Sequence, residues 1–134
     1  MKNLEAALKS EVEKVGSLFH AETDYQSGRV IIKKNRTLEI SLYSNCFTCT
    51  LDHDISFEDF SATGTAFNKA EIMLLPEEYP AFTYALSNHP IPFPSHFRQW
   101  LNVNPHLISI CLETTESPEH FADRLSTALN VLEV

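Results

Sequence analysis

The residues of this chain best suited to chemistry lie between positions 46 and 53. Cys46 and Cys49 form a Cys-x-x-Cys pair, and His53 follows four residues later. Thiolate and imidazole groups are common zinc ligands, and a Cys-x-x-Cys pair can also carry redox chemistry. The surrounding residues, however, alternate between apolar and polar as a β-strand does. Residues three apart on a strand point to opposite faces, so the two thiols diverge and we expect neither a metal site nor a redox pair.

A second candidate is the run Asp52, His53 and Asp54, which places two carboxylates beside an imidazole. General acid–base catalysis needs such groups to converge on one substrate. Neighbouring residues on a strand alternate between faces, so these three side chains cannot converge. The sequence also has no Gly-x-Ser-x-Gly nucleophile elbow, no phosphate-binding loop and no dinucleotide fingerprint. We therefore predict a protein that is not an enzyme and uses no cofactor or metal. A small enzyme or ligand-binding domain is kept as a third hypothesis, which needs a pocket.

The overall charge of the chain is strongly negative. Its 134 residues, interpreted as one domain spanning 1–134, hold 18 Asp and Glu against 10 Lys and Arg, for a formal charge of −8. Such a surface repels nucleic acid and favours basic protein partners. No apolar run approaches the roughly 20 residues of a membrane helix, and acidic residues interrupt the region where a signal peptide needs an apolar core. We expect a cytoplasmic protein with neither a nucleic-acid nor a membrane partner.

The best-defined element is a three-stranded antiparallel meander predicted from Gly28 to His53. Around a two-residue turn at Ser44 and Asn45, apolar residues face one another across two strands while polar residues occupy the other face. The predicted apolar pairs are Leu42 with Phe47, Ile40 with Cys49, and Leu38 with Leu51. The alternation thus predicts one face of this sheet to be buried.

The first strand of the meander is predicted at Arg29–Lys33, joined to the second by a short loop at residues 34–36. Four basic residues would then cluster at the tip of this hairpin: Arg29, Lys33, Lys34 and Arg36. In this arrangement Ile31 and Tyr43 lie on the face away from the helices. These two side chains are our candidates for contact with a partner.

Three helices are predicted from apolar residues spaced three and four apart. The first spans Asn3–His20. The second opens at Pro76, where a proline and two following glutamates suit a helix start, and ends at Asn88. The third begins after Ser117, a good N-cap followed by a proline, and runs to the C-terminus.

The remaining stretches are less regular. The acidic connection after Asp54 is long, so we expect short helical turns or a strand within it. Residues 95–103 fit either a short helix or a strand, and the alternation favours a hairpin with the strand at residues 106–114. The fold class predicted is therefore α+β, with the meander and a C-terminal strand or hairpin packed against the terminal helices.

The order helix, meander, helix, hairpin, helix resembles the class I chaperones of type III secretion. The segments that carry the resemblance are VIIKKNRTLEISLYSNCFTCTL, EEYPAFTYALSN and HLISICLETTESPEHFADRLSTALNVLE. The resemblance implies a homodimer without enzymatic activity. Such a dimer would bind an unfolded segment of a secreted effector on its helix and sheet surfaces.

Our first hypothesis is therefore an acidic protein-binding module of the secretion-chaperone type. It predicts a homodimer held partly by the middle helix, around Tyr79, Phe82 and Leu86. It also predicts a partner protein that touches the outer sheet face near Ile31 and Tyr43.

The alternative hypothesis is an immunity or antitoxin protein that covers the basic active site of a toxin. The acidic residues between Asp52 and Glu78 motivate it, because opposite charge accelerates the association of two proteins. Its predicted contact residues are Asp54, Glu58 and Asp59.

Overall fold

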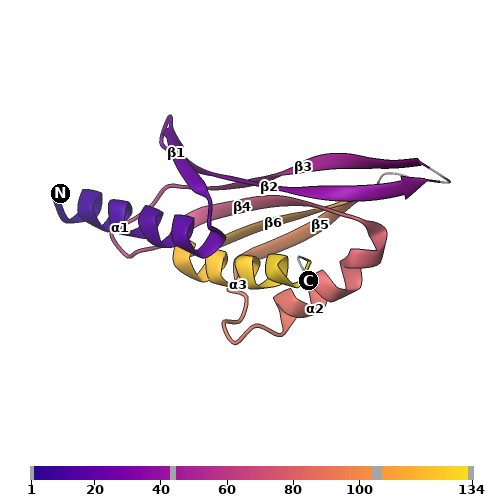
Figure 1. The fold of residues 1–134 in the computed structure, drawn as a ribbon. Coiled ribbons are helices and arrows are strands. Elements are labelled where there is room, and N and C mark those ends of the chain that lie inside the picture. Colours follow the sequence, from indigo (N-terminus) through magenta and orange to yellow (C-terminus); the bar gives the residue numbers. More distant parts are fainter. Residues whose placement is uncertain (1, 43–44, 104–106, 133–134) are drawn as a thin grey trace.

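The computed structural model describes residues 2–42, 45–103 and 107–132, and these form an α+β fold as predicted. The helices are α1 (Lys2–Phe19), α2 (Tyr79–Ser87, preceded by a 3-10 turn at Pro76–Glu78) and α3 (Pro118–Val131). The strands are β1 (Glu22–Gln26), β2 (Arg29–Leu42), β3 (Asn45–Glu58), β4 (Ala66–Leu74), β5 (Phe97–Val103) and β6 (Ile108–Glu116). They form one antiparallel sheet in the order β1-β2-β3-β4-β6-β5, and the helices lie along one side of it (Figure 1).

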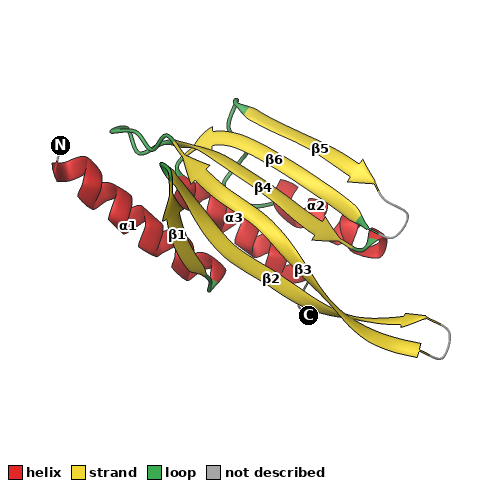
Figure 2. Cartoon of the chain, turned by 90° about the horizontal axis from the view of Figure 1, so that it is seen from above, coloured by secondary structure: helices red, strands yellow, loops and turns green. Residues whose placement is uncertain are grey.

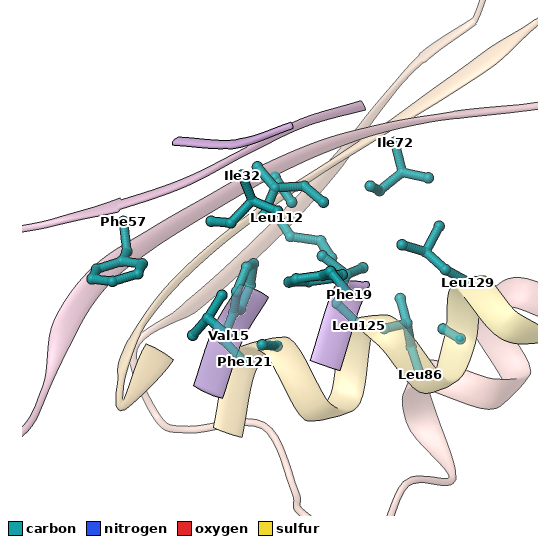
Figure 3. Close-up of a cluster of buried hydrophobic side chains, with 14 of the residues drawn as sticks. Val15, Phe19, Ile32, Phe57, Ile72, Leu86, Leu112, Phe121, Leu125 and Leu129 are labelled. Atoms are coloured by element: carbon teal, nitrogen blue, oxygen red, sulfur yellow. The ribbon is translucent and has the colours of Figure 1, made fainter. Parts of the chain in front are cut away.

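The hydrophobic core lies between the helix layer and one face of the sheet (Figure 3). Strand side chains such as Ile32, Ile72 and Leu112 meet apolar residues of the helices, and each of these strand residues is at most 2% exposed. β4 shows the cause plainly, because its burial alternates residue by residue along its whole length. Alternate side chains of a strand point to opposite faces, so the other face of the same strands stays available.

The hairpin of β2 and β3 is present, but its register differs from our prediction. Leu42 pairs with Asn45 and Ile40 pairs with Phe47, so the pairing is shifted by two residues from the predicted one. The predicted turn at Ser44 and Asn45 was wrong for Asn45, which already belongs to β3; Ser44 lies outside the described residues. A shift of two residues keeps every side chain on its face, so the alternation of the sequence is satisfied equally by both registers.

The predicted loop at residues 34–36 was wrong, because β2 continues unbroken through it. Two of the basic residues that were expected at a hairpin tip face the helix layer instead. Lys34 Nζ donates to the carbonyl of Phe19 at the end of α1, at 3.0 Å. The Arg36 guanidinium binds both carboxylate oxygens of Glu78, one at 2.8 Å, and the carbonyl of Met73 at 3.3 Å. These partners lie 15 to 42 residues away in the chain, so local sequence gave no sign of them.

The sheet has a further strand, β1, which precedes the predicted meander in the chain. β1 pairs with β2 from Gln26 opposite Arg29 to Glu22 opposite Lys33. The two residues between them, Ser27 and Gly28, have φ angles of 52° and 82°. Positive φ at both central residues is the geometry of a type I′ hairpin turn, which glycine favours.

The other elements follow the predictions closely. The acidic connection contains β4, and residues 97–103 form β5, which completes the C-terminal hairpin with β6. The Ser117 hydroxyl accepts a hydrogen bond from the N–H of His120 at 3.2 Å and so caps α3. No helix in the described part of the chain is both long enough and apolar enough to cross a membrane.

Candidate partner-binding surface

The face of the sheet opposite the helices is uncovered, and the strand register fixes which residues share it (Figures 1 and 2). One row crosses the middle of the sheet from β2 to β5 through directly paired positions. It consists of Lys33, Asp54, Glu71, Cys111 and Trp100. The row therefore carries charge in its centre and an aromatic ring at the outer strand.

A second row runs parallel to the first, two residues along each strand. It consists of Ile31, Ser56, Lys69, Glu113 and Arg98. Except for Arg98, the residues of the two rows line a groove of about 680 Å³ on the open face, to which Asp52 and Arg29 also contribute. The groove therefore combines charges of both signs with the apolar side chains of Ile31 and Trp100.

Several charges on this face are already paired within the sheet. Lys33 Nζ lies 3.9 Å from Asp24 Oδ2, and Arg98 Nη1 lies 3.3 Å from Glu113 Oε1. The Arg98 guanidinium also lies 5.2 Å from the centroid of the Trp100 ring. These contacts hold the side chains at the β5 end of the groove in place.

Two carboxylates lie next to each other at the centre of the groove. Asp54 and Glu71 are directly paired across β3 and β4, and like charges in such a pair are destabilising. Glu71 is held by neighbours, since the Ser109 hydroxyl donates to its Oε2 at 2.7 Å and the Cys111 thiol lies 3.6 Å away. Burial and the nearby Glu71 charge raise the pKa of Cys111, which keeps it a thiol. Asp54, in contrast, is exposed and presents its charge to the groove.

The predicted contact residues are only partly brought together. Ile31 and Asp54 lie in the same groove. Glu58 is on the same face at one end, between Arg29 and Phe67 in the register. Asp59 directly follows β3, with φ at 57°, and lies outside the groove. The prediction for Tyr43 falls on a residue outside the described part of the chain.

The predicted dimer residues on α2 need a correction. Phe82 is 0% exposed and Leu86 is 3% exposed, because both belong to the core under α3. These two side chains therefore cannot contact a second chain, although the helical stripe itself was predicted correctly. Tyr79 packs partly against the same core, and the outward side of α2 carries Tyr84, which is 71% exposed.

The residues considered for chemistry do not converge on one site, because their side chains are divided between the two faces of the sheet. His53 is 4% exposed on the helix side, where its Nδ1 accepts a hydrogen bond from the N–H of Met73 at 3.3 Å. Burial, together with the charges of Arg36 and Lys34, lowers the pKa of His53 to about 4. Its neighbours Asp52 and Asp54 are exposed, so the three side chains do not converge, as predicted.

Cys46 is exposed and Cys49 is half-buried, both on β3. Three positions separate them along the strand, so their side chains leave opposite faces. In the part of the chain that the structure describes, no group of three or more His, Cys, Asp or Glu side chains is placed to hold a metal ion.

The sequence predictions missed three residues of β5 as a site. Trp100 is 39% exposed, Leu101 is 40% exposed and Val103 is 71% exposed. A strand with apolar side chains exposed on both faces is unusual. In the sequence, the adjacent Trp100 and Leu101 were the only sign of such a strand. This pair could not be interpreted without the strand order, which makes β5 an edge strand. No protein-family model, curated protein or solved structure matches this chain.

Proposed function

We propose that this protein is a non-enzymatic, acidic protein-binding module that holds an extended segment of a partner protein on its open sheet face. The observation that carries the proposal is the groove of about 680 Å³ on a sheet face that the helices leave uncovered. In this role the protein is similar to a class I chaperone of type III secretion, acts in the cytoplasm and forms a homodimer. The partner is a secreted effector or another protein that a chaperone of this type escorts.

The properties of the groove favour a polypeptide over a small molecule. It is broad and open, and side chains from β2, β3, β4, β5 and β6 line it. A small-molecule site is usually a cleft that encloses most of its ligand. An extended chain can instead alternate its contacts between Ile31, Trp100 and the charged side chains between them. A basic segment suits the groove best, because the exposed carboxylate of Asp54 and the whole-chain charge of −8 attract it.

The second candidate function is an immunity protein that neutralises a basic toxin. Exposed Asp52 and Asp54 on the open face favour it. Three of the other acidic residues favour it less, because Asp59 and Glu77 lie outside the groove and Glu78 is bound to Arg36. A folded toxin would associate in a strongly salt-dependent manner, whereas an extended segment would also depend on apolar contacts.

Co-expression with the products of neighbouring open reading frames tests the proposal. We expect one of these products to co-purify with the protein, and its bound segment to be short and extended. Limited proteolysis of the complex followed by mass spectrometry identifies that segment. Protection of a whole folded toxin domain would support the immunity function instead. If the purified complex turned over a small-molecule substrate at the groove, the proposal would be wrong.

A further inference from the structure

We infer that β5 is the interface between two copies of this chain, which add their β5 strands to one another and join two sheets into one. β5 is the last strand of the sheet (Figure 2), and all of its residues after Phe97 are exposed. Leu101 and Val103 lie on the helix side of the sheet but are 40% and 71% exposed. The helix layer in the described part of the chain therefore leaves them uncovered.

In the described part of the chain, no further strand pairs with the outer edge of β5. Thr115 N–H donates to the carbonyl of His96 at 3.1 Å, which makes His96 and Thr115 a hydrogen-bonded pair of the ladder to β6. Hydrogen-bonded and non-bonded pairs alternate in an antiparallel ladder. Arg98, Trp100 and Asn102 therefore direct their backbone groups toward β6. Phe97, Gln99, Leu101 and Val103 direct theirs outward, where a further strand can bind them.

A second copy of β5 fits this edge in one register along its full length. Antiparallel pairing centred on Trp100 places Phe97 opposite Val103 of the other copy, and Gln99 opposite its Leu101. Every outward-facing residue then meets another outward-facing residue, as the ladder requires. The two Trp100 side chains meet in the central non-bonded pair, where side chains approach most closely. On the helix side, the pairing covers Leu101 and Val103.

Charge favours a second copy at this edge over other sites on the molecule. Each copy carries −8, so two copies repel one another over most of their surfaces. β5 contains no acidic residue, and its one charged side chain, Arg98, is paired with Glu113 of the same chain. The opposite edge of the sheet shows the contrast. β1 is five residues long and carries Glu22 and Asp24, which is the usual protection of an edge strand against pairing.

This inference rests on the homodimer of the proposed function. It needs no partner protein, so the test of dimerisation and the test of partner binding can fail separately. The experiment uses the purified full chain. Light scattering coupled to size-exclusion chromatography should give twice the monomer mass of 15.2 kDa. Trp100 is the single tryptophan, so its fluorescence reports on the interface directly. We expect its emission to shift to shorter wavelength as the protein concentration rises through the dissociation constant.

Two variants locate the interface. Leu101→Lys changes an exposed side chain, and Gln99→Pro removes one outward N–H while leaving the bonds to β6 intact. Each should raise the dissociation constant of the dimer about tenfold or more, with the circular dichroism spectrum unchanged. Gln99→Thr keeps the N–H and should leave the dimer intact. Tyr84→Lys, on the outward side of α2, is the control for dimerisation through that helix and should also have no effect.

The outcomes separate clearly. A monomer at every concentration up to the millimolar range would overturn the inference. So would a dimer that withstands Leu101→Lys and Gln99→Pro, or one that Tyr84→Lys dissociates. Emission from Trp100 that shifts only when another protein is added would assign the edge to that protein rather than to a second copy.

Discussion

Replacing Arg124, on α3, should destabilise this protein strongly. The Arg124 side chain is 1% exposed and binds both carboxylate oxygens of Glu116, at 2.8 and 2.6 Å. It also donates to the carbonyls of Ile91 and Pro92 and lies 4.5 Å from the centroid of the Phe93 ring. One guanidinium thus fixes the proline-rich segment between α2 and β5 against α3.

The magnitude follows from what Arg124→Met leaves behind. The methionine fills most of the space, but the Glu116 carboxylate stays buried without its cation. Removing one partner of a buried ion pair costs about 3 to 5 kcal/mol, against a total stability of about 5 to 15 kcal/mol for a typical domain. With a urea dependence of about 2 kcal/mol per molar, the midpoint of unfolding should fall by about 2 M.

The assay is urea unfolding followed by circular dichroism, with the double variant Arg124→Met/Glu116→Leu as the matched control. A buried ion pair that is replaced entirely by apolar residues is often nearly neutral. The double variant should therefore recover most of the stability that the single variant loses. A single variant within 1 kcal/mol of the wild type, or a double variant that is worse than the single one, would refute the reasoning.

Three further predictions concern the attachment of β2 and β3 and the cap of α3. Because the folded-state pKa of His53 lies near 4 and the unfolded value near 6.5, the folded protein binds fewer protons between them. Stability should be full above pH 6.5 and fall by up to about 3 kcal/mol as the pH decreases toward 4; His53→Gln should flatten this part of the pH profile in urea unfolding. Arg36→Met leaves Glu78 unpaired and should cost about 2 kcal/mol, with faster amide exchange at Met73 and in residues 36–42. Unchanged exchange there would contradict the anchoring role. Ser117→Ala removes the cap of α3 and should cost about 1 kcal/mol in the same unfolding assay, whereas Ser117→Asp should cost little.

The sequence predicted those parts of the fold whose causes are local. α3 has its cap, its proline and its apolar stripe within 15 consecutive residues of Ser117–Val131, and its start was predicted correctly. The β5–β6 hairpin also follows from neighbouring alternation. β2 was divided wrongly because Lys34 and Arg36 resemble a turn in sequence, while their actual partners, Phe19 and Glu78, are distant in the chain.

The candidate site likewise has a part that local sequence predicts and a part that depends on distant elements. Alternation placed Ile31 on the sheet face away from the helices, because the face of a residue depends only on its own strand. It could not identify Trp100 as part of the same groove, since that requires the order of all six strands. Nor could it exclude Phe82 and Leu86 as dimer contacts, because a helical apolar stripe looks the same whether it faces the chain's own core or a second copy.

The central claim is that the open sheet face binds a partner protein. Its most direct test is calorimetric titration of the co-purifying partner segment into the wild type and two charge-reversed variants. Asp54→Lys lies in the groove, and Glu77→Lys makes the same change on an exposed residue of the 3-10 turn before α2. We predict that Asp54→Lys weakens binding about tenfold or more while Glu77→Lys binds like the wild type. Equal affinity for all three proteins, or loss of binding only in Glu77→Lys, would contradict the claim.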